Sequence, residues 1–315
     1  MPSRLIEWPV AGALAGWAAA RLAGADRLRR TESWAVPALS FTPQAAAAAW
    51  AAACLLRRSD AAVTAAVAAA VLTGTVGRRA VRHRAAPADG PVLRVMTANL
   101  LAGRASAQAV IDLVRDRRAD VLFVQELTRD AAARLQGAGL SGLLPHRMTQ
   151  PETRHTMSGI YARYPLHTGT PVPADSAIRC TARLDVPGGP VVELTCVHTA
   201  PPKPPWSRGA TARWRRQLAG LPVAGSEPCI LAGDFNATLD HARFREVLDR
   251  GYVDAASQAG QGLTLTWGPR PGRHPTLLAI DHVLTGPRCA VITTSAHRLP
   301  GSDHRALYAE LRLPL

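Results

Sequence analysis

Residues 228–236 read Pro-Cys-Ile-Leu-Ala-Gly-Asp-Phe-Asn, a short apolar run that ends abruptly in Asp234 and Asn236. The apolar run predicts a buried β-strand. Two polar residues spaced two apart at the end of such a strand can point into one cleft, and functional sites of layered α/β folds gather at strand ends. Asp234 and Asn236 are therefore candidate site residues, with ordinary turn residues as the alternative.

Other apolar runs in the C-terminal part of the chain end in the same way. Residues 91–100 predict a strand that carries Asn99 at its end, and residues 119–126 predict one that ends in Gln125-Glu126. The remaining polar ends are His198 after residues 191–197, Asp281 within residues 280–283, and Asp303 and His304 within residues 301–304. Taken singly, each residue also fits a turn, a helix cap or a surface histidine.

Helices are expected between these strands. Residues 105–117 form an amphipathic pattern with Val110, Ile111 and Val114 on one face, and further helices are predicted around residues 128–135 and 242–249. Strands that end in polar residues and alternate with helices predict an α/β fold, in which helices cover a sandwich of sheets.

The first third of the chain has a different composition, dominated by alanine. Residues 34–56 form 23 residues without a charge, and residues 61–77 form 17 more. These lengths suit helices that cross ~30 Å of hydrocarbon. Residues 9–25 are a weaker third span because Arg21 interrupts them, although an arginine near a helix end can reach the lipid headgroups.

A soluble, alanine-rich helical bundle is the alternative, since alanine is barely hydrophobic and is the best helix former. The stretches lack amphipathic charge patterning, however, and arginine clusters bracket them. A cleaved signal peptide is disfavoured because no short apolar core with a small-residue cleavage site is present. We predict a membrane region at 1–84 with two or three transmembrane helices, a linker at 85–91 and a catalytic domain at 92–315.

The net charge of +14 would ordinarily suggest nucleic acid or an anionic membrane surface as a partner. Lys203 is the only lysine, so the charge comes almost entirely from arginine, in a pattern typical of a GC-rich genome. The charge is therefore weak evidence for a nucleic-acid partner.

The five cysteines have no C-x-x-C spacing, which argues against a zinc site or a disulfide-rich scaffold. Cys180 and Cys196 lie about equally far from Gly188-Gly189 in a predicted hairpin and could face each other. Two buried free thiols are favoured over a disulfide, because cysteine commonly serves as a small apolar core residue.

Seven short motifs occur in a fixed order: T-A-N-L, V-Q-E-L, S-G-I-Y-A-R-Y-P-L, C-V-H, L-A-G-D-F-N-A, I-D-H-V and S-D-H-R-A. In order and spacing the series resembles the endonuclease/exonuclease/phosphatase superfamily, which has the DNase I-like fold. The resemblance covers residues 92–315. It implies a four-layer α/β sandwich, in which two packed β-sheets are flanked by helices and the site lies at the edge where the strands end.

The resemblance also implies a metal-dependent phosphoester hydrolase. In that reading Glu126 is the principal Mg²⁺ ligand, helped by Asn99 and by Asp303 nearby. Oxygen ligands with positions left for water and phosphate suit Mg²⁺, and Mn²⁺ accepts the same ligands.

The catalytic groups are carried over in the same way. Asp234 would orient and deprotonate the attacking water, while Asn236 and His198 would hold phosphate oxygens. His304, paired with Asp281, would stabilise charge as the leaving oxygen departs, since a carboxylate fixes the tautomer and orientation of an imidazole.

The sequence departs from many nuclease members of the superfamily in two respects. It shows no clear equivalent of the extra tyrosine or arginine beside the phosphate, for which Tyr161 and Arg179 are candidate substitutes, and it leaves little length for DNA-binding insertions. These departures favour a small or lipid-borne phosphate over duplex DNA. A membrane-tethered nuclease, a sphingomyelinase-like phosphodiesterase and a binding module without activity remain alternatives.

Apolar helices ahead of this domain, together with the phrase A-D-V-L-F-V-Q-E-L-T, resemble a membrane-bound actinobacterial subgroup of teicoplanin-resistance proteins of VanJ type. That resemblance implies an outward-facing domain that acts on a polyprenyl-lipid pyrophosphate. With three spans, the distribution of arginines would instead place the domain in the cytoplasm. We expect the outward orientation, because a charge rule is weak in an arginine-biased sequence.

A proline-rich stretch at 201–208, with Trp206, and the following Trp214-Arg215-Arg216 could contact lipid headgroups near His198. The alternative is a surface loop that leads into a helix whose Trp214 belongs to the core.

Overall fold

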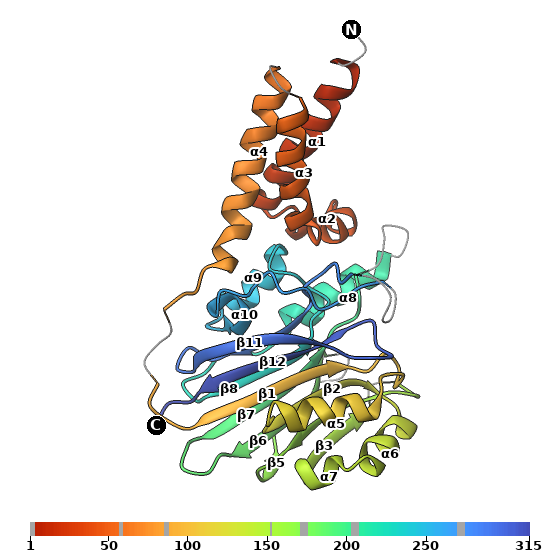
Figure 1. Ribbon diagram of the computed structural model, residues 1–315, viewed down its shortest axis with the longest axis vertical. Helices are drawn as coiled ribbons and strands as arrows, with labels where there is room; N and C mark the ends of the chain where they lie inside the picture. Colours follow the sequence, from red (N-terminus) through yellow and green to blue (C-terminus); the bar gives the residue numbers. More distant parts are fainter. Residues whose placement is uncertain are drawn as a thin grey trace.

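The computed structural model describes residues 4–56, 59–84, 88–151, 153–170, 176–202, 208–269 and 275–315. A helical N-terminal region stands on a sandwich of two β-sheets (Figure 1). The helical region consists of α1 (Arg4–Ala23), η1 (Ala25–Arg27), α2 (Glu32–Leu39), α3 (Thr42–Leu55), α4 (Asp60–Gly77) and η2 (Arg78–Ala80).

Each sheet has six strands and is mixed, with one parallel pair among antiparallel neighbours. The first sheet has the order β11 (Ala290–Arg298), β12 (Arg305–Arg312), β1 (Val92–Asn99), β2 (Val121–Leu127), β4 (Met157–Ala162) and β3 (His146–Pro151). The second has the order β5 (Leu166–Thr168), β6 (Ile178–Asp185), β7 (Val191–His198), β8 (Cys229–Asp234), β10 (Asp281–Thr285) and β9 (Val253–Asp254). The parallel pairs are β1–β2 and β7–β8, so two strands end side by side in each sheet.

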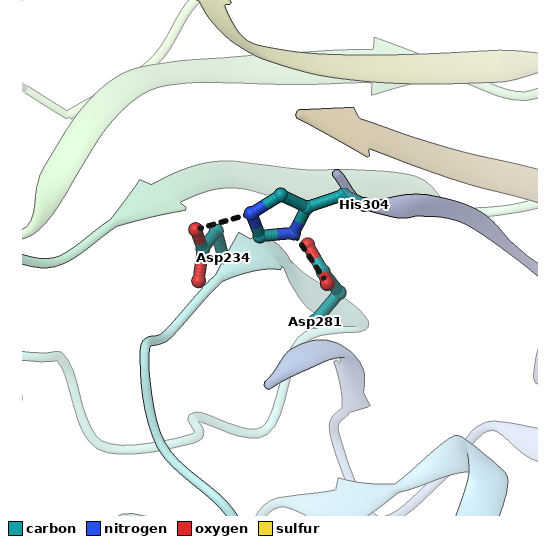
Figure 2. Close-up of side chains that lie close together, drawn as sticks. All are labelled: Asp234, Asp281 and His304. Atoms are coloured by element: carbon teal, nitrogen blue, oxygen red, sulfur yellow. Dashed lines mark hydrogen bonds and ion pairs between the residues drawn. The ribbon is translucent and has the colours of Figure 1, made fainter. Parts of the chain in front are cut away.

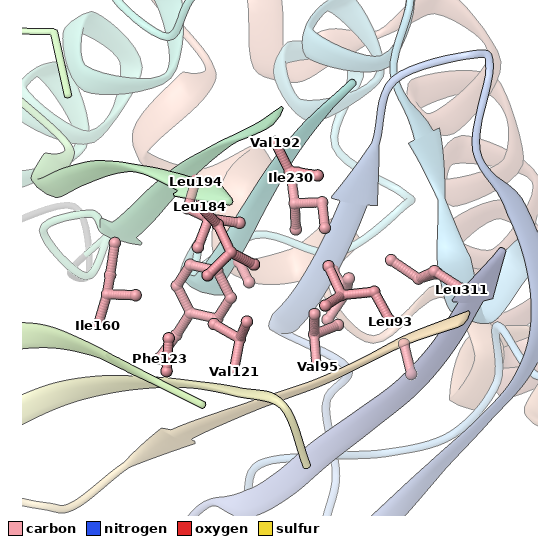
Figure 3. Packing of buried hydrophobic residues seen from close by; sticks show 14 of the residues in the cluster. Leu93, Val95, Val121, Phe123, Ile160, Leu184, Val192, Leu194, Ile230 and Leu311 are labelled. Atoms are coloured by element: carbon pink, nitrogen blue, oxygen red, sulfur yellow. The ribbon is translucent and has the colours of Figure 1, made fainter. Parts of the chain in front are cut away.

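The main core lies between the two sheets, where side chains such as Val95, Phe123 and Leu194 meet (Figure 3). Successive side chains of a strand point to opposite faces, so Met96 and Ala98 of β1 belong to a second core on the outer face of the first sheet. That face is covered by α5 (Ala107–Asp116), α6 (Arg129–Gly137) and α7 (Leu140–Leu143). A third core joins the second sheet to α8 (Arg208–Ala219) and α9 (Ala242–Leu248), while α10 (Ala255–Gln258) follows β9. The predicted α/β sandwich is confirmed.

The elements predicted for the sandwich are present with small shifts at their ends. The amphipathic segment 105–117 is α5, whose buried residues are Val110, Ile111 and Val114. In the β6–β7 hairpin Cys180 lies opposite Cys196, and, as expected, both are buried thiols rather than a disulfide.

The helical region differs from the prediction in its second apolar stretch. The apolar stretch 34–56 is not one straight helix, because α2 and α3 meet at an angle of 73°. The break precedes Thr42-Pro43, where α3 begins. Proline disfavours helical conformation in the residue before it and is well placed in a first helical turn, so the chain stops one helix and starts another.

Within the part of the chain that the structure describes, Asp60–Ala80 is the one helix long and apolar enough to cross a membrane, or one of two if the bent pair α2–α3 is counted as a single span. The weaker candidate at 9–25 lies in α1, which is not among them. Large apolar side chains are exposed on this region: Ile6, Trp8, Val10, Leu22, Trp34, Phe41, Trp50, Leu55, Val63 and Val67. The interior between α1, α3 and α4 is mostly alanine.

Buried charges join the helical region to the sandwich. Asp240, in the loop between β8 and α9, receives hydrogen bonds from Arg21 of α1 at 2.8 Å and from Arg79 of η2 at 2.8 and 2.5 Å. The Asp240 side chain is fully buried and both arginines are nearly so. Burial raises the pKa of Asp240, but the two arginines outweigh burial and lower it. Asp240 is thus a charged anchor for two separate helical segments.

Candidate active site

Three polar residues meet where β8 lies between β7 and β10. Asp234 ends β8, and its register partners are His198 at the end of the parallel strand β7 and Asp281 at the start of the antiparallel strand β10. Gly233, with φ of 150°, allows the backbone of β7 to lie close to β8, because a Cβ atom at this position would overlap the Val197 carbonyl oxygen. The topology of the second sheet therefore gathers three of the predicted site residues.

The first sheet delivers two more residues at the ends of β1 and β2. Asn99 ends β1, and Glu126 lies at a bulge in β2, where the pairing with β4 shifts between Val124 and Leu127. Glu126 has φ of 54° and Asn236, just beyond β8, has φ of 46°. Left-handed backbone costs non-glycine residues ~1 kcal/mol or more and persists where surrounding structure enforces it, often at functional sites.

Asn99 connects the two sheets. Its Nδ2 donates to Glu126 Oε1 at 3.2 Å and to Asp234 Oδ2 at 3.1 Å, while its Oδ1 accepts from the Leu101 backbone N–H at 3.0 Å. Glu126 Oε2 accepts from the Ala102 N–H at 2.7 Å. These bonds fix the orientations of both carboxylates at the edge where the sheets meet.

Asp281, His304 and Asp234 form a buried chain of side chains (Figure 2). His304 Nδ1 lies 2.9 Å from Asp281 Oδ2, and His304 Nε2 lies 3.7 Å from Asp234 Oδ2. Burial lowers the pKa of His304, but the carboxylates of Asp281 and Asp234 outweigh it and raise the pKa to about 10. Burial raises the pKa of Asp234 to about 6, with Asp281 adding to the rise and His304 opposing it. At neutral pH the arrangement favours a protonated imidazole beside a carboxylate able to exchange a proton.

His198 and Asn236 border the same cluster. His198 Nε2 lies 3.9 Å from Glu126 Oε1 and 3.8 Å from Asp234 Oδ2, so it faces both carboxylates. Asn236 donates its backbone N–H to Asp234 Oδ1 at 2.8 Å and its side-chain amide to the Thr199 carbonyl at 3.0 Å. Asn236 therefore holds Asp234 and the following loop as well as lying beside the site.

Asp303 bears on the question of a metal ion. Its Oδ2 accepts from Trp267 Nε1 at 3.1 Å, whereas its Oδ1 is buried and has no hydrogen-bond partner among the residues that the structure describes. That oxygen lies 3.9 Å from His304 Nε2. A buried carboxylate oxygen without a donor is costly unless a cation compensates it.

The site is rich in oxygen donors of the kind that Mg²⁺ and Mn²⁺ prefer. Ligand atoms of Asp234, Asp281 and His304 all lie within 4.8 Å of one another, which is consistent with a divalent metal site. Glu126 and Asp303 add two carboxylates with oxygens directed at the same cluster. The donor set fits a divalent cation, and Asp303 Oδ1, which lies 3.9 Å from His304 Nε2 and accepts no hydrogen bond from the described residues, is open to one.

The structure thus brings all eight predicted site residues to one edge of the sandwich. Tyr161 and Arg179 were the two candidates for an additional phosphate-binding residue. Arg179 lies at this edge, with its Nε donating to the His198 carbonyl at 2.9 Å. Tyr161 does not, because it is buried in the core under α5–α7. Residues 203–207 of the proline-rich stretch lie outside the described residues, and Trp214 is a core residue, fully buried.

Sequence reasoning missed two supporting residues. Thr266 Oγ1 accepts from the backbone N–H groups of Ile280 and Asp281, and Trp267 donates to Asp303. Neither follows an apolar strand, so the pattern of strand ends could not reveal them.

The sequence comparison agrees with this geometry. Residues 96–304 match the model of the Endonuclease/Exonuclease/phosphatase family. The chain belongs to this family. Its site is accordingly that of a metal-dependent phosphoester hydrolase, and its buried Asp–Asp–His group is consistent with the divalent metal site typical of the family. No curated protein matches the chain in sequence.

Solved structures share the fold at low identity. A family member from Beutenbergia cavernae DSM 12333 has a TM-score of 0.54 and 19% identity over 71% of this chain and 72% of its own. The D. rerio TDP2 humanized by 14 mutations has a TM-score of 0.56 and 17% identity over 70% and 98%. SmcL has a TM-score of 0.50 and 14% identity over 70% and 99%.

Proposed function

We propose that the protein is a membrane-anchored, Mg²⁺-dependent phosphohydrolase that acts on a lipid-linked phosphate or pyrophosphate such as undecaprenyl pyrophosphate. We further propose that it belongs with the VanJ-type subgroup and acts in glycopeptide (teicoplanin) resistance. The observation that carries the proposal is the exposed apolar surface of the N-terminal helices. These helices are held through Asp240 to the loop that follows Asn236 of the active site. An enzyme held in this way against a bilayer has lipid phosphates as its nearest substrates.

Membrane placement rests on exposed apolar surface. The candidate span Asp60–Ala80 is only 33% buried. Large exposed apolar patches on a protein mark a partner or a membrane surface. In this proposal the protein crosses the cell membrane more than once, and the catalytic domain faces outward.

The metal assignment follows the oxygen donors. Glu126 and Asp303 would hold Mg²⁺, with Mn²⁺ as the other candidate, whereas Asn99 was expected as a further ligand. When bound, the ion would neutralise charge on the phosphate and lower the pKa of nearby water. Asn99 presents its Nδ2 to the two carboxylates in this structure, so its contribution here is to hold Glu126 and Asp234 in place.

Side chains of the protein would carry out the proton transfer and the stabilisation of charge. Asp234, with a pKa near 6, accepts the proton of the attacking water, because a general base works best with a pKa near the operating pH. Asp281 holds His304 through Nδ1, which leaves the protonated Nε2 to hydrogen-bond to a phosphate oxygen as negative charge builds up. His198 is placed to bind a phosphate oxygen beside Glu126.

The proposal is tested by phosphate release from undecaprenyl pyrophosphate with detergent-solubilised full-length protein. Plasmid DNA and sphingomyelin are assayed in parallel. Asp234→Asn is the inactive variant, and Asp116→Asn, at an exposed position on α5, is the matched control. We expect release by the wild type and by Asp116→Asn alone. Plasmid nicking or sphingomyelin cleavage without lipid phosphate release would replace the proposal with a nuclease or a phosphodiesterase.

A further inference from the structure

A cavity of about 270 Å³ lies between the helical region and the sandwich. Its apolar lining comes from both parts and includes Pro43, Ala47, Leu239, Leu263, Leu265 and Leu277. Most polar groups at its margin are engaged by the protein, although Gln44 Oε1 is buried without a hydrogen-bond partner among the described residues. Arg79 is bound to Asp240, and the Gln44 side-chain amide donates to the Leu277 carbonyl at 2.7 Å. What the cavity chiefly offers a ligand is therefore apolar surface.

The cavity and the active site share three segments of the chain. Residues 238–240 line the cavity and begin two residues after Asn236. Leu265 lines it, while the next two residues, Thr266 and Trp267, hold Asp281 and Asp303. Residues 277–279 line it and lead into Asp281. A ligand in the cavity therefore contacts segments that also position the catalytic carboxylates.

The other wall of the cavity is the bend between α2 and α3. Ser40, Pro43, Gln44 and Ala47 line the cavity around the 73° break. Figure 1 shows α2 between the longer helices of the N-terminal region and the sandwich. Trp34 of α2 is 66% exposed, and tryptophan favours the headgroup level of a bilayer. The bend thus places the cavity beside the surface where the helical region would leave the membrane.

We propose that this cavity binds a segment of the hydrocarbon chain of the lipid phosphate whose headgroup occupies the active site. The proposal rests on the proposed function and names a substrate-binding site within it. Its volume lies just below the ~300 Å³ at which pockets begin to enclose whole drug-sized ligands, so it suits part of a chain whose remainder stays in the bilayer. The site and the cavity then select an amphiphile, with charge at one end and hydrocarbon at the other.

Filling the cavity tests this role. Ala47→Phe places a ring at a lining position of α3, and Ala48→Phe makes the same change at a neighbour outside the lining; both alanines are exposed, so only their relation to the cavity differs. We expect Ala47→Phe to lower kcat/KM for a long-chain polyprenyl phosphate by about 10-fold or more, since one methylene group more or less in an apolar pocket already changes kcat/KM by about 10-fold. Hydrolysis of p-nitrophenyl phosphate, which has no hydrocarbon chain, should be unchanged. Ala48→Phe should change neither rate. Equal rates for both variants on the long-chain substrate would overturn the proposal.

Binding is measured separately from turnover, so that failure of this proposal differs from failure of the proposed function. A polyprenyl monophosphate with a photoreactive diazirine in its chain is added to the Asp234→Asn protein in nanodiscs, and the labelled peptides are mapped. We expect labelling within residues 262–269 or 275–279 that Ala47→Phe abolishes and Ala48→Phe preserves. Labelling there without lipid phosphate hydrolysis by the wild type would retain the cavity as a lipid site and remove the proposed activity. Labelling confined to the outer faces of α1, α3 and α4 would overturn the cavity proposal.

Discussion

Asp234 and Asp240 lie six residues apart, and both are buried, yet their surroundings give them opposite properties. Asp234 sits among Asp281, His304 and His198, and its pKa is raised to about 6. Asp240 sits between Arg21 and Arg79, and its pKa is lowered. The first carboxylate can exchange a proton near neutral pH, whereas the second stays charged.

The contrast separates the chemistry of the molecule from its assembly. Desolvation disfavours a charge at both positions, and only the neighbouring charges differ. At the strand ends the neighbours leave a carboxylate poised for reaction. Where the helical region meets the sandwich, Arg21 and Arg79 form ion pairs with Asp240. These ion pairs keep Asp240 charged and hold the helical region against the sandwich.

The largest effect is expected on turnover. Asp234→Asn removes the proton acceptor and should lower kcat on a lipid phosphate by about 10³-fold, within the range that general acid–base groups supply. The melting temperature should not fall, because burial raises the pKa of Asp234 and so makes its charge unfavourable to folding at neutral pH. Measured kcat within about 10-fold of wild type would show that Asp234 is not the base.

Asp240→Asn is expected to act on stability. It leaves Arg21 and Arg79 buried without a counter-charge, which should lower the free energy of unfolding by ~3–5 kcal/mol. Urea unfolding of the full-length protein measures the loss. The control is Glu246→Gln, which removes partly exposed ion pairs with Arg27 and Arg243 and should cost less than ~1 kcal/mol. Similar losses for the two variants would contradict the anchoring role.

Metal binding tests the assignment of ligands at the site. Glu126→Gln should raise the half-saturating Mg²⁺ concentration by at least ~10-fold, because it removes a carboxylate charge. Trp267→Phe removes the hydrogen bond to Asp303 and should cause a smaller rise. Titration of Mn²⁺ followed by electron paramagnetic resonance reports binding without turnover. An unchanged Mn²⁺ affinity in Glu126→Gln would place the ion on other groups.

The smallest effect concerns pH and the junction. Burial lowers the pKa of His241 below the ordinary 6.5. Its Nδ1 accepts from the Thr238 N–H at 3.0 Å and its Nε2 lies 2.8 Å from the Val36 carbonyl, so the neutral ring fits both partners. Below pH ~6.5 the unfolded chain binds a proton that the folded protein does not, so stability falls as pH falls.

The measurement is the melting temperature between pH 7.5 and 5. His241→Gln should flatten the acid side of the curve, and His155→Gln, at an exposed position, should leave its slope unchanged. Parallel curves for the wild type and His241→Gln would show that protonation of this ring does not weaken the junction.

The strand ends could be predicted because an apolar run that stops at a polar residue is a local signal. That signal found Asn99, Glu126, His198 and Asp234 before any contact between them was known, whereas Asp281, expected at a strand end, begins β10. The strand register determines which of these residues are neighbours, since the parallel pairing of β7 with β8 places His198 beside Asp234.

The junction could not be predicted in this way. Arg21 reads from sequence as a charge that interrupts an apolar helix, but its partner Asp240 is 219 residues away along the chain. The bend between α2 and α3 reflects packing against the sandwich as well as Pro43. The cavity depends on both, so no segment of sequence taken alone contains it.

The most direct test of the central claim is phosphate release from a polyprenyl pyrophosphate in nanodiscs by full-length protein stripped of metal with EDTA and then restored with Mg²⁺. Wild type and Asp234→Asn are assayed side by side, and folding is checked by melting temperature. The result predicted is release by the wild type that stops with EDTA, returns with Mg²⁺ and is absent in Asp234→Asn. Folded wild-type protein that releases no phosphate with Mg²⁺ restored, or release that survives both EDTA and the substitution, would contradict it.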